Sequence, residues 1–151
     1  MKQLMTMHVK TKDSYGILGA ITGEIGYNSF DHNLGGWPDT PGVFFGYDID
    51  RGSVVLADRG LGILATLKRV KPELSSHKDA LRTAFTEILS GRSPENRGNG
   101  LKFVYGLVIK YPIDLVFQTG DAVLTLGENQ KSLNIKHSEE FVRGCLVSIK
   151  F

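Results

Sequence analysis

The stretch that most constrains the fold of this chain is the hexapeptide DRGLGI at residues 58–63. It directly follows an apolar, β-branched run at residues 53–57 (SVVLA), which predicts a buried strand. The strand therefore ends in a carboxylate, Asp58, which can accept a hydrogen bond from a neutral amino group. Gly60 and Gly62 let the backbone approach a flat ligand closely. Taken alone, the same pattern also fits an acidic turn after a strand.

The composition is that of one soluble domain. The 151 residues are enough for a sizeable core, and 41% of them are hydrophobic and 23% charged. A net charge of +2 gives no support for binding to nucleic acid or to a membrane surface. The single cysteine excludes an internal disulfide, no apolar stretch is long enough to span a bilayer, and the N-terminus has no secretory pattern. We therefore expect a cytoplasmic protein.

Helical and strand patterns alternate along the chain. Helices are expected over residues 13–32, 64–72, 77–89 and 101–111. Strands are expected over residues 2–10, 43–47, 53–57, 113–119, 122–126 and 142–151. The strands at 113–119 and 122–126 are expected to form a hairpin around Gly120 and Asp121.

The first predicted helix carries a polar stripe. Glu24, Asn28 and His32 recur at i, i+4, so their side chains share one face, which is either a functional face or a solvated one. Glycines in a helix cost about 1 kcal/mol each relative to alanine, so the four in this helix indicate that another element packs closely against it. These glycines are Gly16, Gly19, Gly23 and Gly26.

A glycine-rich stretch at residues 90–100 (SGRSPENRGNG) precedes the last predicted helix. Gly98 and Gly100 therefore lie at a helix N-terminus. Exposed amides and the positive end of the helix dipole favour an anion at such a position.

Three motifs thus occur in order: Glu24-x3-Asn28-x3-His32 on a helix, the Asp58 turn after a strand, and residues 98–101 (GNGL) opening a helix. This arrangement resembles the Bergerat-fold ATPases of the GHKL group, which includes gyrase, heat-shock chaperones, histidine kinases and mismatch-repair ATPases. The resemblance covers residues 14–151. It implies a single domain with a two-layer α/β sandwich fold, in which a mixed sheet is covered on one face by three helices.

The resemblance also implies that the chain binds ATP with Mg²⁺. Asp58 matches the aspartate that accepts a hydrogen bond from the adenine amino group, and Gly60, Gly62 and Ile63 lie beside the ring. Cys145 falls on a late strand where the family often carries a threonine that supports adenine. Because a thiol is a poor hydrogen-bond partner, this departure weakens that contact.

At the phosphate end, the resemblance implies that Asn28 reaches Mg²⁺ and that Glu24 is the general base. Leu101, Gly98 and Gly100 match the glycine box at the base of an ATP lid, which would span residues 64–97. Candidates for the γ-phosphate are Arg97, Arg92 and Lys68, although Arg97 also fits a plain loop charge. Lys102 stands where many histidine kinases have a further glycine, and it either contacts phosphate or faces solvent. For His32, a packing or capping role is favoured over catalysis.

Within the family, a small domain of this kind looks most like the anti-sigma-type serine kinases, which phosphorylate a small partner protein. The γ-phosphate is then transferred or hydrolysed. The alternative is a nucleotide-gated interaction module with little turnover, and a plain ATPase or a fragment of a longer chain is a third reading. Expected partners are ATP or ADP and a small STAS-like or sigma/anti-sigma-type protein, with a homodimer as a further option and no nucleic acid or membrane.

Overall fold

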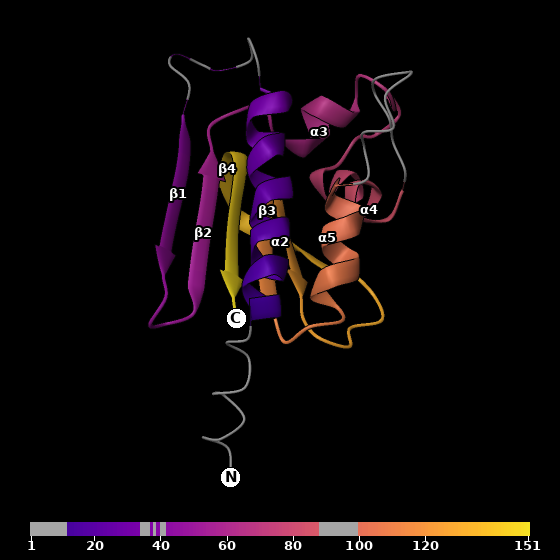
Figure 1. The fold of residues 1–151 in the computed structure, drawn as a ribbon. Helices are drawn as coiled ribbons and strands as arrows, with labels where there is room; N and C mark the ends of the chain where they lie inside the picture. The colour runs from indigo at the N-terminus through magenta and orange to yellow at the C-terminus, as the bar shows by residue number, and fades with distance from the viewer. Residues whose placement is uncertain (1–11, 34–36, 38, 40–41, 88–99) are drawn as a thin grey trace.

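The computed structural model describes residues 12–33, 37, 39, 42–87 and 100–151, with the side chains of residues 12–14 left aside. The chain forms two layers, a four-stranded sheet and a set of helices on one of its faces (Figure 1). The expected two-layer α/β sandwich is therefore confirmed. The edge strand expected at residues 2–10 lies outside the described residues.

The sheet consists of β1 (Val43–Asp48), β2 (Ser53–Asp58), β3 (Asp114–Leu126) and β4 (Asn134–Lys150) in the order β1-β2-β4-β3. All three pairings among these described strands are antiparallel. The expectation of a mixed sheet is corrected on this point. The β1–β2 hairpin agrees with its predicted bounds to within one residue at each end.

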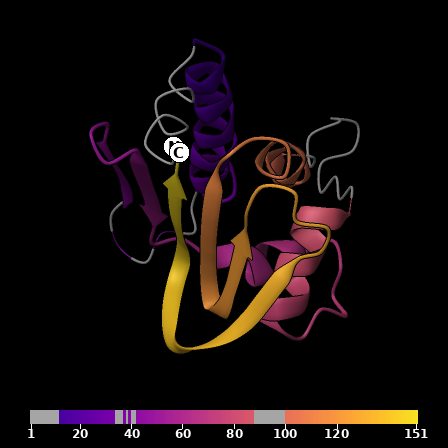
Figure 2. The same cartoon turned by 90° about the horizontal axis from the view of Figure 1, so that it is seen from below.

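The prediction of a hairpin around Gly120 and Asp121 is wrong. Residues 114–126 form one continuous strand, and its pairing with β4 shifts register around Gly120. Gly120 has a φ of 56°, which is typical of a β-bulge rather than a chain reversal. The bulge accompanies a strong bend of the β3–β4 ribbon, which Figure 2 shows along β4. The last strand accordingly starts at Asn134, earlier than expected.

Four described helices accompany the sheet: α2 (Lys12–Asp31), α3 (Gly62–Leu67), α4 (His77–Thr86) and α5 (Gly100–Val108). Helix α3 corresponds to the helix expected over residues 64–72, but it begins two residues earlier, directly after the Asp58 turn, and ends at Leu67. Ser76 caps α4, because its hydroxyl accepts a hydrogen bond from the Asp79 N–H. None of the described helices is both long and apolar enough to cross a bilayer.

The core lies between the helices and the sheet. Ile21 and Ile25 of α2, one helical turn apart, are buried there. Phe85 of α4 is fully buried and packs edge-to-face on Phe117 of β3, with ring centroids 5.5 Å apart. Helix α4, although it falls within the expected lid, is thus anchored in the core.

The glycines of α2 do not mark a close contact within the described chain. A methyl group added to Gly16 or Gly19 would meet nothing within 4 Å, and one added to Gly23 would meet only Tyr27 of the same helix. Only Gly26 faces a neighbouring strand, where a methyl group would lie 3.8 Å from Leu56. The close packing expected from these glycines is therefore not found among the described residues.

Candidate functional site

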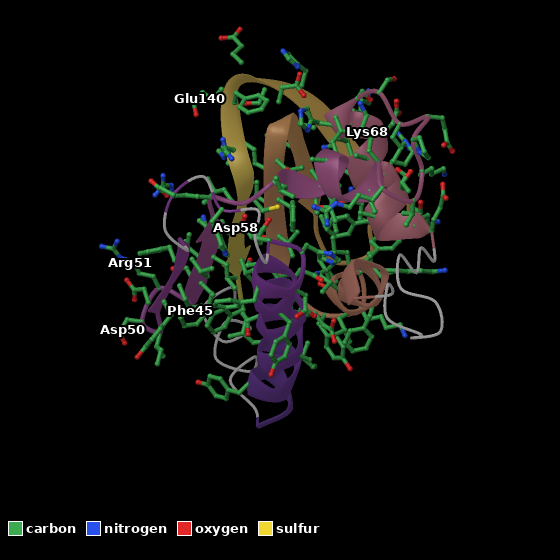
Figure 3. The ribbon with its side chains drawn as sticks, turned by 90° about the horizontal axis from the view of Figure 1, so that it is seen from above. Phe45, Asp50, Arg51, Asp58, Lys68 and Glu140 are labelled. Atoms are coloured by element: carbon green, nitrogen blue, oxygen red, sulfur yellow. The ribbon has the colours of Figure 1, made fainter. Side chains whose placement is uncertain are left out.

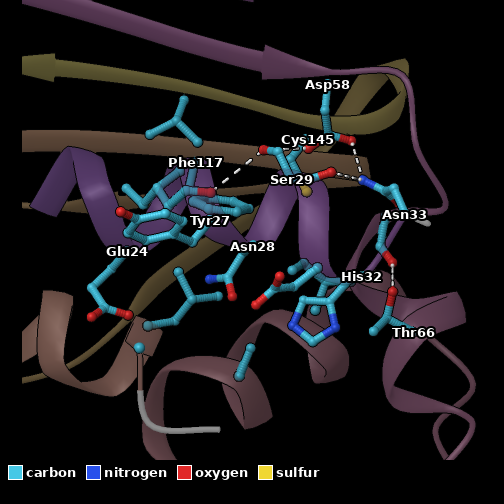
Figure 4. Close-up of a pocket in the computed structure, with 18 of the residues that line it drawn as sticks. Glu24, Tyr27, Asn28, Ser29, His32, Asn33, Asp58, Thr66, Phe117 and Cys145 are labelled. Atoms are coloured by element: carbon cyan, nitrogen blue, oxygen red, sulfur yellow. Dashed lines mark hydrogen bonds between the residues drawn. The ribbon is translucent and has the colours of Figure 1, made fainter. Parts of the chain in front are cut away.

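A cavity of about 940 Å³ opens between the helices and the sheet, walled by α2, α3, the C-terminal half of α4, the start of α5 and the adjoining parts of β2, β3 and β4. Figure 4 shows that Asp58 and Cys145 approach it from the strands, while Glu24, Asn28 and His32 approach it from α2. The side chains that the sequence spacing put on one helix face thus share the cavity with the strand-end carboxylate.

Asp58 is the charged group held deepest in this site, with 6% of its surface exposed. Its Oδ1 accepts the Gly60 N–H at 2.8 Å and the Asn33 Nδ2 at 3.2 Å, while Oδ2 accepts the Ser29 hydroxyl at 3.1 Å. Burial raises the pKa of the Asp58 carboxyl above its ordinary value, and hydrogen bonds from Gly60, Ser29, Asn33 and the Cys145 backbone oppose this rise. The site is therefore a buried acceptor held by several donors.

Glycines make room around this carboxylate. Gly144 pairs next to Asp58 in the sheet, with a φ of 80°, and a methyl group on it would come within 2.6 Å of the Asp58 Oδ1. A methyl group on Gly60 would overlap the Asn33 amide. Gly62 has a φ of 77° and lies close to Thr119. Three residues were predicted to lie beside the adenine ring. Gly62 and Ile63 line the cavity, whereas Gly60 does not line it, and its N–H donates a hydrogen bond to Asp58.

Cys145 lines the cavity and is half-buried. Its pKa is raised, chiefly by burial and then by the neighbouring Asp58 carboxylate. In register with it on β3 stands Thr119, which is fully buried. The Thr119 hydroxyl donates to the Gly144 carbonyl at 2.7 Å and accepts the Ile63 N–H at 3.3 Å.

Elsewhere in the cavity, α2 meets the start of α5. A methyl group on Gly100 would come within 2.6 Å of the Glu24 Oε2 and 3.7 Å of the Asn28 Nδ2. Leu101 also lines the cavity while its side chain packs in the core. Four residues predicted to act together, Glu24, Asn28, Gly100 and Leu101, are therefore adjacent.

The basic residues expected near the phosphates are less fully described. Arg97, Gly98 and Arg92 lie outside the described residues. Lys68 is exposed and does not line the cavity (Figure 3 labels it on α3's side of the molecule). Among the described lysines and arginines only Arg69, which the sequence analysis did not single out, lines it. Lys102 is exposed on α5 and does not line the cavity.

A scan against protein-family models and a search of curated proteins found no match. Among solved structures, the chain is similar to the 43K ATPase domain of Thermus thermophilus gyrase B, a structure determined in complex with an aminocoumarin. The TM-score is 0.51 at 19% sequence identity, over 88% of this chain and 33% of that one. This chain thus spans about a third of that gyrase chain.

The likeness establishes the fold. The chain has the α/β fold of the GHKL ATPase domains, as its motif order predicts.

Sequence reasoning missed three polar residues of this site: Ser29, Asn33 and Thr119. Ser29 directly follows Asn28 in the sequence, and Asn33 directly follows His32. Ser29 could therefore have been noticed as a polar residue beside the Glu24–Asn28–His32 stripe. Thr119 could not have been found, because its approach to Ile63 and Gly144 depends on strand order and on the β3–β4 register.

Proposed function

We propose that this chain binds ATP together with Mg²⁺ in the cavity between α2 and the sheet. The observation that carries the proposal is the buried Asp58 carboxylate, which accepts hydrogen bonds from Ser29, Asn33 and Gly60 while lining a cavity large enough for a nucleotide. An ionised carboxylate only accepts hydrogen bonds, so its natural ligand is an amino group such as the one adenine carries at position 6. Ile63, Gly62 and Cys145 would lie beside the ring.

The phosphates would lie where α2 meets α5. Glu24 precedes Ser29 along α2 by roughly 7.5 Å of helical rise, so Glu24 is set apart from the base-recognition end. The first amides of α5 favour an anion there. Arg97 and Gly98, just ahead of this helix in the sequence, and Arg69, on the cavity wall, are further candidates for phosphate contacts.

The oxygen ligands available at this end of the cavity suit Mg²⁺. Among the described residues no group of three or more His, Cys, Asp or Glu side chains could hold a metal by itself. Mg²⁺ keeps several waters and usually binds through one or two protein oxygens plus substrate phosphates, so the Asn28 amide oxygen is sufficient as the protein ligand. When bound, the metal would neutralise phosphate charge.

For turnover, Glu24 is the general base that orients or deprotonates the attacking water or hydroxyl. The finer proposal is a serine kinase of the anti-sigma type acting on a small STAS-like partner, in the cytoplasm and with a lid over residues 64–97. Its rival is a nucleotide-gated interaction module, in which ATP binding changes the surface offered to a partner and little phosphate is released. A homodimer is compatible with either form.

The test combines binding with turnover. Wild type, Asn28→Ala and Glu24→Gln are titrated with ATP in Mg²⁺ and in EDTA, and phosphate release is followed with and without candidate partner proteins. Asn28→Ala should lose the Mg²⁺-dependent part of the affinity. Glu24→Gln should keep or improve ATP affinity, because a negative charge near the γ-phosphate is removed, and should slow turnover by about 10²-fold or more.

Two results would change the proposal. Turnover of Glu24→Gln at the wild-type rate would remove Glu24 as the base. Tight ATP binding by a wild type that releases and transfers no phosphate would favour the interaction module.

A further inference from the structure

Asn33 lies two residues beyond the C-terminal end of α2, directly beside the Asp58 carboxylate (Figure 4). We infer that Asn33 is a positioning residue that orients Asp58 and thereby sets a preference for purines with an amino group at position 6 over purines with an oxo group. This inference rests on the proposed nucleotide-binding function.

All the hydrogen-bonding groups of the Asn33 side chain are committed. The residue is 3% exposed, its Oδ1 accepts the Leu61 N–H at 2.8 Å, and its Nδ2 donates to the Ser29 carbonyl at 2.9 Å and to Asp58 at 3.2 Å. A backbone N–H can only donate, and a carbonyl or carboxylate can only accept, so the amide has one chemically consistent orientation. Asn33 therefore ties the end of α2 to both ends of the Asp58 turn.

The geometry requires Gly60. A side chain there would overlap the Asn33 amide, and the Gly60 N–H donates to the same Asp58 oxygen as Asn33 does. The glycine of the DRG sequence thus serves the Asn33–Asp58 contact rather than a direct ligand contact, which agrees with its absence from the cavity wall.

The two oxygens of Asp58 are used unequally. Oδ1 accepts hydrogen bonds from both Gly60 and Asn33, whereas the Ser29 hydroxyl donates to Oδ2. Each carboxylate oxygen has two lone pairs. By holding Oδ1, Asn33 fixes the plane of the carboxylate and leaves acceptor capacity on Oδ2 for a ligand.

The protonation of Asp58 decides which purine fits. An ionised carboxylate attracts a 6-amino group and repels the oxygen of a 6-oxo group, whereas a protonated acid could donate to that oxygen. Burial favours the protonated form, and the hydrogen bond from Asn33 is among those that favour the ionised form. Removing Asn33 should therefore weaken discrimination, because a hydrogen-bonding site rejects an analogue only while its polar groups are held in place.

The experiment measures the ratio of ATP affinity to ITP affinity by calorimetry in Mg²⁺. The variants are Asn33→Ala, Ser29→Ala, and Asn134→Ala as a control, since Asn134 is exposed on β4 and donates to Thr125 outside the cavity. We expect the ATP:ITP ratio to fall by about tenfold or more in Asn33→Ala, to fall less in Ser29→Ala and to stay at the wild-type value in the control. If alanine at position 33 prevents folding, Asn33→Ser keeps a small donor and should give an intermediate ratio.

A second readout needs no nucleotide. The Asp58 carboxyl is titrated by carbon NMR in wild type and Asn33→Ala, and its pKa should be higher in the variant. Equal losses of ATP and ITP affinity, or an unchanged Asp58 pKa, would overturn the inference by reducing Asn33 to a structural role. If the wild type binds neither nucleotide, the proposed function and the purine preference both fail, and the carboxyl titration still decides whether Asn33 acts on Asp58.

Discussion

The Glu24 carboxylate lies against the α-carbon of Gly100, so closely that a methyl group on Gly100 would come within 2.6 Å of Oε2. Glu24 belongs to the first described helix and Gly100 opens the last one. The contact joins two motifs that are far apart in the sequence, and it explains why the second position carries no side chain.

Gly100→Ala should therefore separate stability from activity. The clash is with the end of a flexible side chain, which can move aside, so the melting temperature should change little. The displaced carboxylate should lower phosphate release by about tenfold or more. Gly106→Ala is the matched control, because it lies in the same helix with nothing within 4 Å and should leave turnover unchanged. Equal turnover in Gly100→Ala and wild type would contradict a role for this contact.

The ionised Asp58 carboxyl should lower the free energy of unfolding at neutral pH. Burial raises the pKa of its carboxyl in the folded chain, so between the unfolded value and this raised value the folded state binds more protons than the unfolded state. The free energy of unfolding then falls as pH rises through that window. Asp58→Asn removes this loss, and the new amide can donate to the Ser29 hydroxyl oxygen. Thermal melts from pH 4 to pH 8 should show the variant at least as stable as wild type at pH 7, with its advantage shrinking towards pH 4.

A wild type that is clearly more stable than Asp58→Asn at pH 7 would show that the hydrogen bonds to Asp58 outweigh its burial.

Cys145 offers a simple chemical probe, because it is the only cysteine in the chain. Its raised pKa keeps the thiol protonated, and the thiolate is the reactive form. Labelling by a thiol reagent at pH 8 should be at least about tenfold slower in the native protein than in urea. Because the side chain faces the cavity, ATP should slow labelling further. Native labelling as fast as in urea would contradict this placement.

Much of the fold followed from local patterns. The predicted bounds of the β1–β2 hairpin and of α2 agree closely with the structure. Short-range geometry put Glu24 and Asn28 on one helix face and Asp58 at a strand end, and the resemblance to the GHKL ATPases predicted that they share a site.

Long-range pairing explains what the sequence did not reveal. A glycine and an aspartate between two apolar runs look the same in a turn and in a bulge, so the strand around Gly120 was divided in two. The contacts of Asn33 and Thr119 depend on how α2 and β3 pack beside the Asp58 turn, which one sequence does not specify.

The most direct test of the account is a calorimetric titration of wild type and Asp58→Asn with ATP in Mg²⁺, with Asn134→Ala as the control. The variant keeps the shape of the side chain but replaces an acceptor with a donor. A lost hydrogen bond to a charged group predicts ATP affinity lower by roughly 10- to 100-fold, with the control unchanged. Equal ATP affinity in wild type and Asp58→Asn, or no ATP binding by the wild type, would contradict the claim that this buried carboxylate recognises adenine.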